Sequence, residues 1–348
     1  MVHLQCNSPQ LSLVLRRPVR CFVRLRRPLR IFSLFVAAML TTMPGFAQTQ
    51  QKFPSKPIRL VVAFTPGGTT DILARLITPG MHEVWGQPVV IEARPGAGGT
   101  LAASIVAKAA ADGYTLLATS PAFAISAVAS SNLQYDPIKD FTGVGEIGYS
   151  TSVLVVAPSL GVKTVKEFIA LANARPGKIL FGSAGALTST HLGAERFRLV
   201  TGIKAQHVGY KGQPEFLIEI VAERIHFGSP GLTVALPFIR DGKLVPLVVA
   251  TPQRTPALPD VPAAPEVLPG WGREGSQAWL APAGTPRAIR HQISREMARA
   301  LALPEVRERL QNLGFQIAST TPEEHDKNLR ADIEVFSRIV REAGLKPK

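Results

Sequence analysis

Phe64-Thr65-Pro66-Gly67-Gly68-Thr69-Thr70-Asp71 is the stretch around which the chain is organised. Here an apolar strand, predicted over Ile58 to Phe64, gives way to a helix predicted to open near Thr70. Two glycines let a ligand approach the backbone, and the first helical turn presents N–H groups without intrahelical partners at the positive end of the helix dipole. Such groups favour a carboxylate or a phosphate. The same residues also fit an ordinary strand-to-helix turn with Thr70 as N-cap and Asp71 complementing the dipole, so both interpretations stay open.

Residues 1–47 have the composition of a secretory signal peptide. They hold seven Arg, no Lys and no acidic residue, followed by an apolar run from Ile31 to Leu40 that is too short to span a bilayer. The small residues Gly45 and Ala47 predict cleavage before Gln48. An uncleaved N-terminal anchor is the alternative.

Removing residues 1–47 changes the bulk properties of the chain. The 39 basic and 25 acidic residues become 32 and 25, and the net charge falls from +14 to +7. A mildly basic chain with interspersed charges suits a receptor for anions better than a nucleic-acid binder, which needs clustered Lys and Arg. Both cysteines, Cys6 and Cys21, leave with the signal, so the mature chain has neither a disulfide nor a thiolate ligand.

The mature chain predicts an α/β fold with two domains. About 300 residues exceed one comfortable core. Continuously apolar runs alternate with helix-like stretches, which is typical of buried parallel strands covered by helices on both faces. These runs are Ile58 to Phe64, Val89 to Ile91, Tyr114 to Thr119, Ile179 to Gly182 and Leu244 to Ala250.

Three helix starts are marked by capping residues. Thr164 has Glu167 three residues later, Thr285 is followed by Pro286, and Thr321-Pro322-Glu323-Glu324 opens a long amphipathic helix. Leu329, Ile333, Phe336 and Val340 share one face of that helix, which is expected to run to a Gly344 C-cap. In the first helix, Pro79-Gly80 predicts an end or a kink, because proline removes a backbone donor.

A second strand, small-residue loop and helix start occurs at Phe181 to Leu192, reading FGSAGALTSTHL. Ligands of open α/β sheets bind outside the carboxyl ends of strands. Two such loops in two halves of a chain therefore predict a cleft between the halves.

These motifs together resemble the extracytoplasmic receptors of tripartite tricarboxylate transporters, the Bug-type solute-binding proteins. The resemblance covers essentially all of the mature chain. The residues that carry it are Phe53 to Ile58, Pro66 to Asp71, Gly86 to Val90, Arg94 to Gly99, Asp112 to Leu117, Tyr135 to Pro137, Lys139 to Phe141, Gly182 to Gly185, Thr188 to Leu192, Tyr210 to Gly212, Leu258 to Pro262 and Ala281 to Pro286. Each motif is weak alone, and the ordered set is highly specific.

The resemblance implies a two-domain periplasmic-binding-protein fold of the type 2-like, Venus flytrap kind, with two crossover strands near Phe141 to Val156 and Ser276 to Pro282. It places domain 1 at residues 52–149 plus 273–348 and domain 2 at residues 150–272, after the signal peptide at 1–47. It further implies a monomeric periplasmic receptor without a cofactor. Its expected partners are a small carboxylate, held in the interdomain cleft, and the membrane components of a tripartite tricarboxylate transporter or a sensor kinase.

The resemblance also implies which residues bind the ligand. The backbone of Thr65 to Thr69 would receive one carboxylate, and Asp71 would contact an ammonium, amide or hydroxyl beyond it. The full expected set is Thr65, Pro66, Gly67, Gly68, Thr69, Asp71, Thr119, Ser120, Phe123, Ser183, Ala184, Gly185, Thr188, Ser189, His191, Tyr210 and Lys211. Departures from the family pattern leave the identity of the acid open; they are Ala93, Leu187, Gly209, Gly228-Ser229 and Ser276.

Signals for catalysis are weak. Ser183 with His191 as its base is the alternative hydrolase hypothesis, but Phe181 stands where a nucleophile elbow needs glycine. Arg94 to Gly99 lacks the spacing of a dinucleotide loop, and the mature histidines show no metal-ligand spacing. An interaction protein with a vestigial cleft is the third hypothesis.

Overall fold

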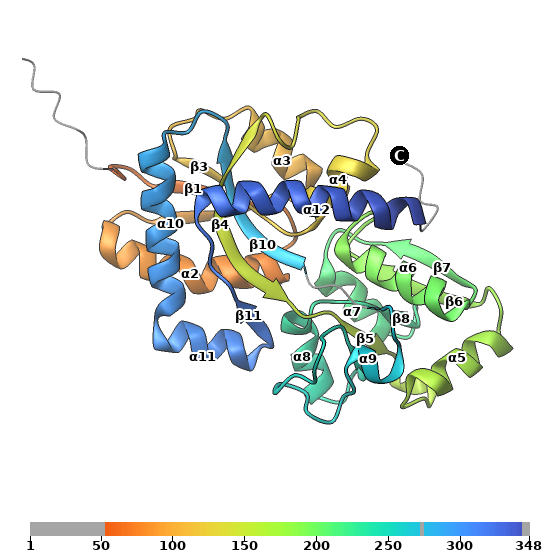
Figure 1. Cartoon of the computed structure of the whole chain (residues 1–348). Coiled ribbons are helices and arrows are strands. Elements are labelled where there is room, and N and C mark those ends of the chain that lie inside the picture. The colour runs from red at the N-terminus through yellow and green to blue at the C-terminus, as the bar shows by residue number, and fades with distance from the viewer. Residues whose placement is uncertain (1–52, 272–274, 343–348) are drawn as a thin grey trace, which may run out of the picture. The chain divides into compact units, whose positions relative to one another are not determined.

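The computed structural model describes residues 53–271 and 275–342, which form two mixed β-sheets with helices packed on them (Figure 1). The predicted signal peptide, the cleavage before Gln48, both cysteines and the Gly344 C-cap lie outside the described residues. We call each sheet with its helices a lobe.

The first lobe contains the strands in the order β11-β4-β10-β3-β1-β2. Its elements are β1 (Ile58–Val62), α2 (Thr69–Trp85), β2 (Val89–Ala93), α3 (Thr100–Ala107), β3 (Thr115–Thr119), α4 (Ala122–Ala129), β4 (Phe141–Ser150), β10 (Gly275–Pro282), α10 (Arg287–Ala302), α11 (Pro304–Asn312), β11 (Phe315–Ile317) and α12 (Pro322–Glu342).

The second lobe contains the strands in the order β7-β6-β8-β5-β9. Its elements are β5 (Val153–Val156), α5 (Val165–Ala174), β6 (Ile179–Ser183), α6 (Ser189–Thr201), β7 (Ala205–Gly209), α7 (Gln213–Val221), β8 (Phe227–Gly228), α8 (Leu232–Arg240), β9 (Val245–Val249) and α9 (Ala264–Val267).

The α/β class is confirmed, and the parallel pairing is confirmed for four of the five predicted strands. β1 lies parallel to β2 and β3, and β6 lies parallel to β7 and β8. The fifth strand, β9, is antiparallel to β5, so the prediction of parallel pairing for Leu244 to Ala250 was wrong. Leu247, Val248 and Val249 are nevertheless buried. A continuous apolar run therefore reports burial on both faces and not strand direction.

Both faces of β1 are buried, which explains its uninterrupted apolar sequence. Leu60 and Val62 pack into one cluster with Leu73 of α2 and Met297 of α10. Val61 belongs to the opposite cluster with residues of α3, α4 and α12. The helices therefore cover the first sheet on both sides, and β1 ends between them.

One connection crosses directly between the lobes. β4 belongs to the first sheet and β5 to the second, and only Thr151 and Ser152 separate them. The two strands together cover Phe141 to Val156, the first predicted crossover. β10 coincides with the second predicted crossover, Ser276 to Pro282.

Two of the three predicted caps are present as expected. Thr164 and Glu167 form a reciprocal capping box at α5, and the side chains of Thr321 and Glu324 exchange bonds with each other's backbone N–H at α12. At α10 the prediction was one residue off, because Pro286 is the N-cap and Thr285 Oγ1 donates to Pro282 O at 2.7 Å.

Helix α2 continues through Pro79 and Gly80 to Trp85, so the predicted end at these residues was wrong. A Cβ on Gly80 would lie 3.0 Å from Leu303 Cδ1 and 3.2 Å from Ala300 Cβ. Gly80 therefore lets α2 pack closely on the end of α10. That packing favours the helix despite the missing proline donor.

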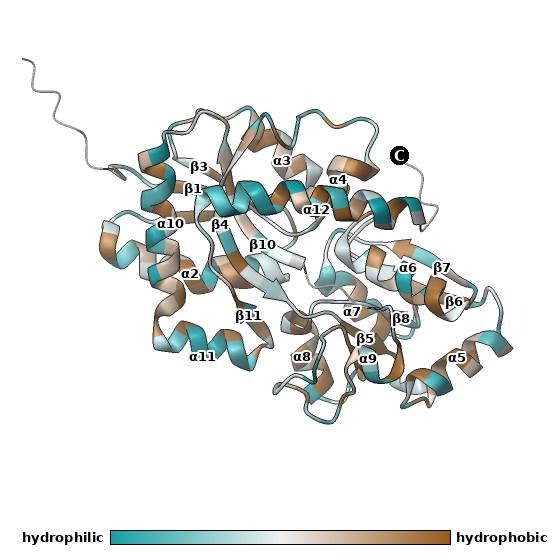
Figure 2. Cartoon of the chain, viewed as in Figure 1, coloured by the Kyte–Doolittle hydropathy of each residue, from teal (hydrophilic) through white to brown (hydrophobic). Residues whose placement is uncertain are grey.

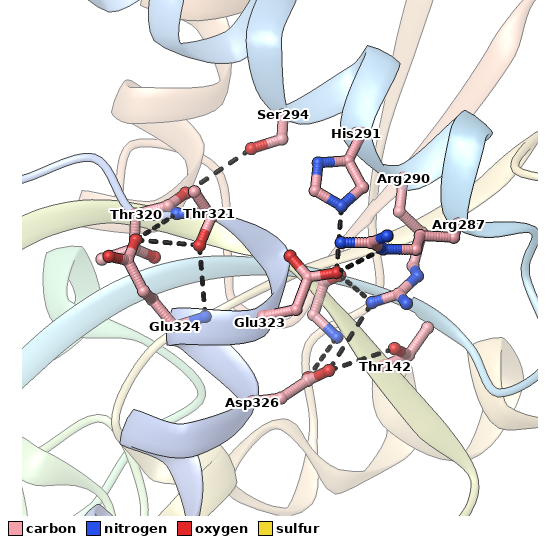
Figure 3. Close-up of polar contacts among 11 residues, drawn as sticks. Thr142, Arg287, Arg290, His291, Ser294, Thr320, Thr321, Glu323, Glu324 and Asp326 are labelled. Atoms are coloured by element: carbon pink, nitrogen blue, oxygen red, sulfur yellow. Dashed lines mark hydrogen bonds and ion pairs between the residues drawn. The ribbon is translucent and has the colours of Figure 1, made fainter.

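Helix α12 has the apolar face predicted for it. Leu329, Phe336 and Val340 are buried and Ile333 packs against their cluster. Alternating teal and brown segments along α12 in Figure 2 show this two-sided character. Figure 3 shows how the polar side joins α10: Glu323 Oε1 accepts from Arg287 Nε and contacts His291 Nε2, both at 2.9 Å. These contacts hold α12 against α10.

Candidate functional site

The loop between β1 and α2 ends at an uncapped helix N-terminus. Gly68 is the N-cap, and no described side chain bonds to the first-turn N–H groups in its place. Thr70 is therefore not the N-cap, and its Oγ1 instead donates to Gln277 Oε1 of β10 at 2.9 Å. The N–H groups of Thr69 and Thr70 remain donors at the positive end of a 17-residue helix.

The two glycines of this loop have different roles. Gly67 has φ +78°, a conformation that L-residues with a side chain rarely adopt. Gly68 has φ −74°, and its N–H donates to Thr65 O at 3.2 Å. A Cβ on Gly68 would lie 3.2 Å from that same oxygen. Backbone conformation therefore requires glycine at position 67, whereas close approach favours it at position 68.

Asp71 holds the loop in place from inside the helix. Its Oδ2 accepts from Gly67 N at 2.9 Å and from Arg75 Nε at 2.8 Å. The hydrogen bond that Arg75 donates to the Asp71 carboxylate raises the pKa of Arg75 above its ordinary value. Asp71 Oδ1 is buried without a hydrogen-bond partner among the described residues. Oδ2 therefore supports the loop, while Oδ1 accepts no hydrogen bond from a described residue.

In the second loop, by contrast, side chains satisfy most of the backbone donors. Ala184 N donates to Thr190 Oγ1 at 2.9 Å, Gly185 N to Ser183 Oγ at 3.2 Å, and Leu187 N to His191 Nδ1 at 3.1 Å. Thr188 is the N-cap of α6, with its Oγ1 accepting from His191 N at 3.4 Å. Ser189 is the first residue of that helix. The two loops are therefore unequal, and the first keeps more of its helix donors available to an anion.

The hypothesis that His191 is the base for Ser183 was wrong in its choice of histidine. Ser183 Oγ lies 2.6 Å from His207 Nε2 of β7 and donates to Gly185 O at 2.9 Å. His191 Nε2 lies 3.7 Å from Glu195 Oε1, and the rings of the two histidines are 4.0 Å apart. The reason is topological: β6 and β7 are adjacent parallel strands, so residues far apart in the sequence share one edge. The Ser183 side chain is fully buried.

The loop after β7 brings the second lobe against the first. A Cβ added to Gly212 would collide with Thr65 Oγ1. A Cβ added to Gly67 would lie 3.7 Å from Pro214 Cγ. Thr65 Oγ1 donates to Glu215 Oε2 at 3.2 Å, and Gln213 Nε2 donates to Thr69 Oγ1 at 3.2 Å. The start of α7 therefore lies directly on the first loop.

Tyr210 and Lys211 precede this contact. Burial raises the pKa of the Tyr210 phenol, and the charge of Glu219 adds to the shift. Lys211 is exposed. The second loop meets the first lobe at another point, where a Cβ on Gly98 would lie 3.3 Å from Ala186 O. Both predicted loops therefore lie at the boundary between the lobes, each facing a different segment of the opposite lobe.

Thr119, Ser120 and Phe123 line a separate small cavity. It measures about 20 Å³, room for about one water, and is also lined by Glu146, Ser276 and residues of β10 and α12. Glu146 Oε2 accepts from Asn328 Nδ2 at 3.1 Å, while both ring nitrogens of the buried His325 have no hydrogen-bond partner among the described residues. The structure thus groups these three predicted site residues with α12 and not with the second loop.

Sequence reasoning missed three residues that contact the two loops: His207, Gln213 and Glu215. The strand order β6 then β7 around a helix was a signal for the first of these, because consecutive parallel strands are usually neighbours. The pairings of Gln213 and Glu215 with the first loop depend on how the two lobes meet, which no local pattern encodes. Within the described residues there is no cluster of three or more His, Cys, Asp or Glu side chains able to hold a metal ion.

Two mixed sheets joined by a direct crossover, with the uncapped N-terminus of α2 at the boundary between the lobes, are the arrangement of periplasmic binding proteins. The profile of the tripartite tricarboxylate transporter family receptor matches residues 73–345. The chain belongs to this family. No helix in the described part of the chain has the length and apolar character needed to cross a membrane.

Known relatives agree along almost the whole chain. The protein BugT of Bordetella pertussis is 30% identical over 331 residues, 94% of this chain and 100% of BugT. The solved structure of Rpa4515 of R. palustris with adipate is 33% identical, with a TM-score of 0.82 over 85% of this chain and 100% of that one. MatC of Rhodopseudomonas palustris with bound malate is 32% identical, with a TM-score of 0.78 over 83% and 100%.

Proposed function

We propose that this chain is a periplasmic receptor that holds a small carboxylate between its two lobes. The observation that carries the proposal is the N-terminus of α2, where Gly67 and Gly68 lead into first-turn N–H groups that no side chain caps. The similar proteins with adipate and with malate support a carboxylate as ligand. The receptor would deliver its ligand to the membrane components of a tripartite tricarboxylate transporter or to a sensor kinase.

The domain boundaries and maturation belong to the same proposal. Residues 52–149 plus 273–348 form one domain, and residues 150–272 form the other. The protein acts as a monomer after cleavage before Gln48. Intact mass of the exported species tests the cleavage site. A mature species that retains Ile31 to Leu40 would contradict it and favour the anchor.

A thermal-shift panel of mono-, di- and tricarboxylates tests the binding function. A ligand at about a hundred times its Kd stabilises the native state by about 2.7 kcal/mol, which a melting curve detects easily. We expect a subset of linear dicarboxylates to raise the melting temperature. If no acid in the panel raises the melting temperature, the proposal is rejected and an interaction protein with a vestigial cleft is favoured.

A serine hydrolase is the alternative function. It can be tested because Ser183 Oγ lies 2.6 Å from His207 Nε2. We propose that the receptor has no such activity, because Ser183 is fully buried and its Oγ also bonds to Gly185. A nucleophile must reach its substrate, and this oxygen does not reach the surface. Chromatographic analysis of each stabilising compound after incubation should show no turnover. Turnover that Ser183→Ala abolishes would establish the hydrolase instead.

A further inference from the structure

A second concave region lies between the lobes, away from both loops described above. It encloses about 970 Å³, at the upper end of the range for small-molecule sites. Its walls come from the C-terminal end of α8, the segment after β9, α11 and β11. The lining residues are Arg240, Thr251 to Ala257, Arg307, Gln311, Asn312 and Gly314 to Ile317.

The lining of this region is cationic. It includes Arg240, Arg254 and Arg307 and no Asp or Glu. Arg307 forms no ion pair with a described residue, and Arg240 makes one bond, from Nη2 to Asn312 O at 3.4 Å. Two guanidinium groups from opposite lobes therefore face the same space with most of their donors unused.

The third arginine is held rigidly by neighbours outside the lining. Arg254 donates from Nε and Nη2 to Glu266 and from Nη1 to Pro259 O at 3.3 Å. Of its five N–H groups, the two not used by these bonds remain available. Glu266 occupies the Nε and Nη2 fork of Arg254 and neutralises its charge, so Arg254 adds only its two unused N–H groups to the lining.

A buried hydroxyl in the same wall lacks a partner. Thr251 is 4% exposed, and its Oγ1 makes no hydrogen bond to a described residue. Unpaired buried polar atoms are uncommon, because each keeps the cost of losing its water. This oxygen is closed off from the region itself, so an occupant would reach it only after the wall around Thr251 had moved.

Sheet order separates this region from the first two loops. In the first sheet β11 lies on one side of β4, while β10, β3 and β1 lie on the other. In the second sheet β9 lies on one side of β5, while β8, β6 and β7 lie on the other. The arginines therefore come from elements on the β11 and β9 side of the crossover, and the two loops follow β1 and β6 on the opposite side.

We propose that this arginine pocket is a second anion site, for a small solute with two or more oxyanion groups. Arg240 and Arg307 supply the charge from the two lobes, and Arg254 supplies the two N–H groups that its own partners leave unused. Phosphate groups and carboxylate groups share this chemistry, so pyrophosphate and citrate serve as the two probes.

Calorimetry on the exported protein tests the site in a phosphate-free buffer of low salt. The variant is Arg240→Gln with Arg307→Gln, which removes exposed side chains. The matched control is Arg309→Gln, an exposed arginine of α11 outside the lining. We expect the double variant to lower the affinity for at least one probe by tenfold or more. Arg309→Gln should change the affinity for either probe by less than twofold. A loss confined to pyrophosphate identifies phosphate compounds as the solute class, and a loss confined to citrate identifies polycarboxylates.

Two outcomes would overturn the second site. One is that neither probe binds the wild-type protein. The other is that the double variant and the control bind equally well. The Gly67→Ala variant keeps this test independent of the proposed function, because it alters the first loop and should leave pyrophosphate affinity unchanged. If Gly67→Ala abolishes pyrophosphate binding, the probe occupies the first loop and the second site is rejected.

Discussion

Gly67 is the residue of the loop between β1 and α2 that has a left-handed backbone conformation. Its φ of +78° strains any side-chain-bearing residue, and its N–H is fixed by Asp71. Gly67→Ala should therefore shift the loop and lower affinity for every carboxylate, by about tenfold, which equals about 1.4 kcal/mol of binding free energy. Calorimetry with a stabilising acid measures the change.

Gly177 provides the matched control for this substitution. It has φ +74° with nothing within 4 Å of an added Cβ, in the turn before β6. Gly177→Ala introduces similar backbone strain, about 1–2 kcal/mol for a left-handed residue, without touching the loop. Equal carboxylate affinities of the two variants would show that the loop does not bind the acid.

Asp71 is expected to select among ligands. Its unpartnered Oδ1 can accept a hydrogen bond, whereas a bare carboxylate would be repelled by it. Asp71→Asn should weaken the binding of acids that carry a hydroxyl or ammonium by about 1 to 3 kcal/mol. The binding of acids that carry only carboxylates should not weaken. Malate and adipate are a suitable pair for calorimetry, because only malate has a hydroxyl.

Arg75→Gln separates ligand selection from the effect of the Asp71–Arg75 ion pair. It removes the same ion pair but keeps the Asp71 carboxylate. Selective loss of malate in Asp71→Asn alone would support the role in selection. If the two variants shift the affinities for both acids alike, the shared loss of the Asp71–Arg75 ion pair explains the effect and Asp71 does not select the ligand.

At the scale of elements, α12 is held on α10 by charges as well as by its apolar face. The hydrogen bond from Arg287 lowers the pKa of Glu323 from its ordinary 4.5 to about 2. A carboxyl with a depressed pKa in the folded state contributes stability above its unfolded pKa and loses it as the pH falls toward the folded pKa. The melting-temperature difference between wild type and Glu323→Gln should be full at pH 6 and less than half as large at pH 3.

Glu334→Gln is the control on the same helix. Glu334 is exposed and forms no ion pair with a described residue. The melting temperatures of wild type and Glu334→Gln should therefore show no comparable difference at pH 6. A pH-independent difference between wild type and Glu323→Gln would mean that the ion pair does not contribute.

Elements were predictable from the sequence where their causes are local. The burial of β1 on both faces and the Thr164 and Thr321 caps follow from residues within one or two turns of each other. The direction of β9 and the continuation of α2 past Pro79 depend on partners far along the chain, β5 and the end of α10. The same holds for the site. Gly67 and Asp71 were visible in the loop itself, whereas Ser183 finds His207 only because β6 and β7 pair.

At the scale of the whole molecule, the short crossover between β4 and β5 suits a hinge. Thr65 and Thr69 of the first lobe bond to Glu215 and Gln213 of the second, so the loop and the start of α7 can enclose a ligand between them. If the ligand lies between the lobes, as proposed, neither lobe alone can remove it from water. Small-angle scattering should therefore show a smaller radius of gyration on saturation with a stabilising carboxylate. An unchanged radius would reject closure of the lobes.

Amide NMR of the mature chain, titrated with the acid that stabilises it most, tests the central claim most directly. The account predicts that the largest amide shifts fall on Thr69 and Thr70, whose N–H groups are left uncapped at the start of α2. Smaller shifts should follow at Gln213 and Glu215, because these side chains bond to the same loop. Saturable shifts centred elsewhere in the chain, with Thr69 and Thr70 unmoved, would contradict the account.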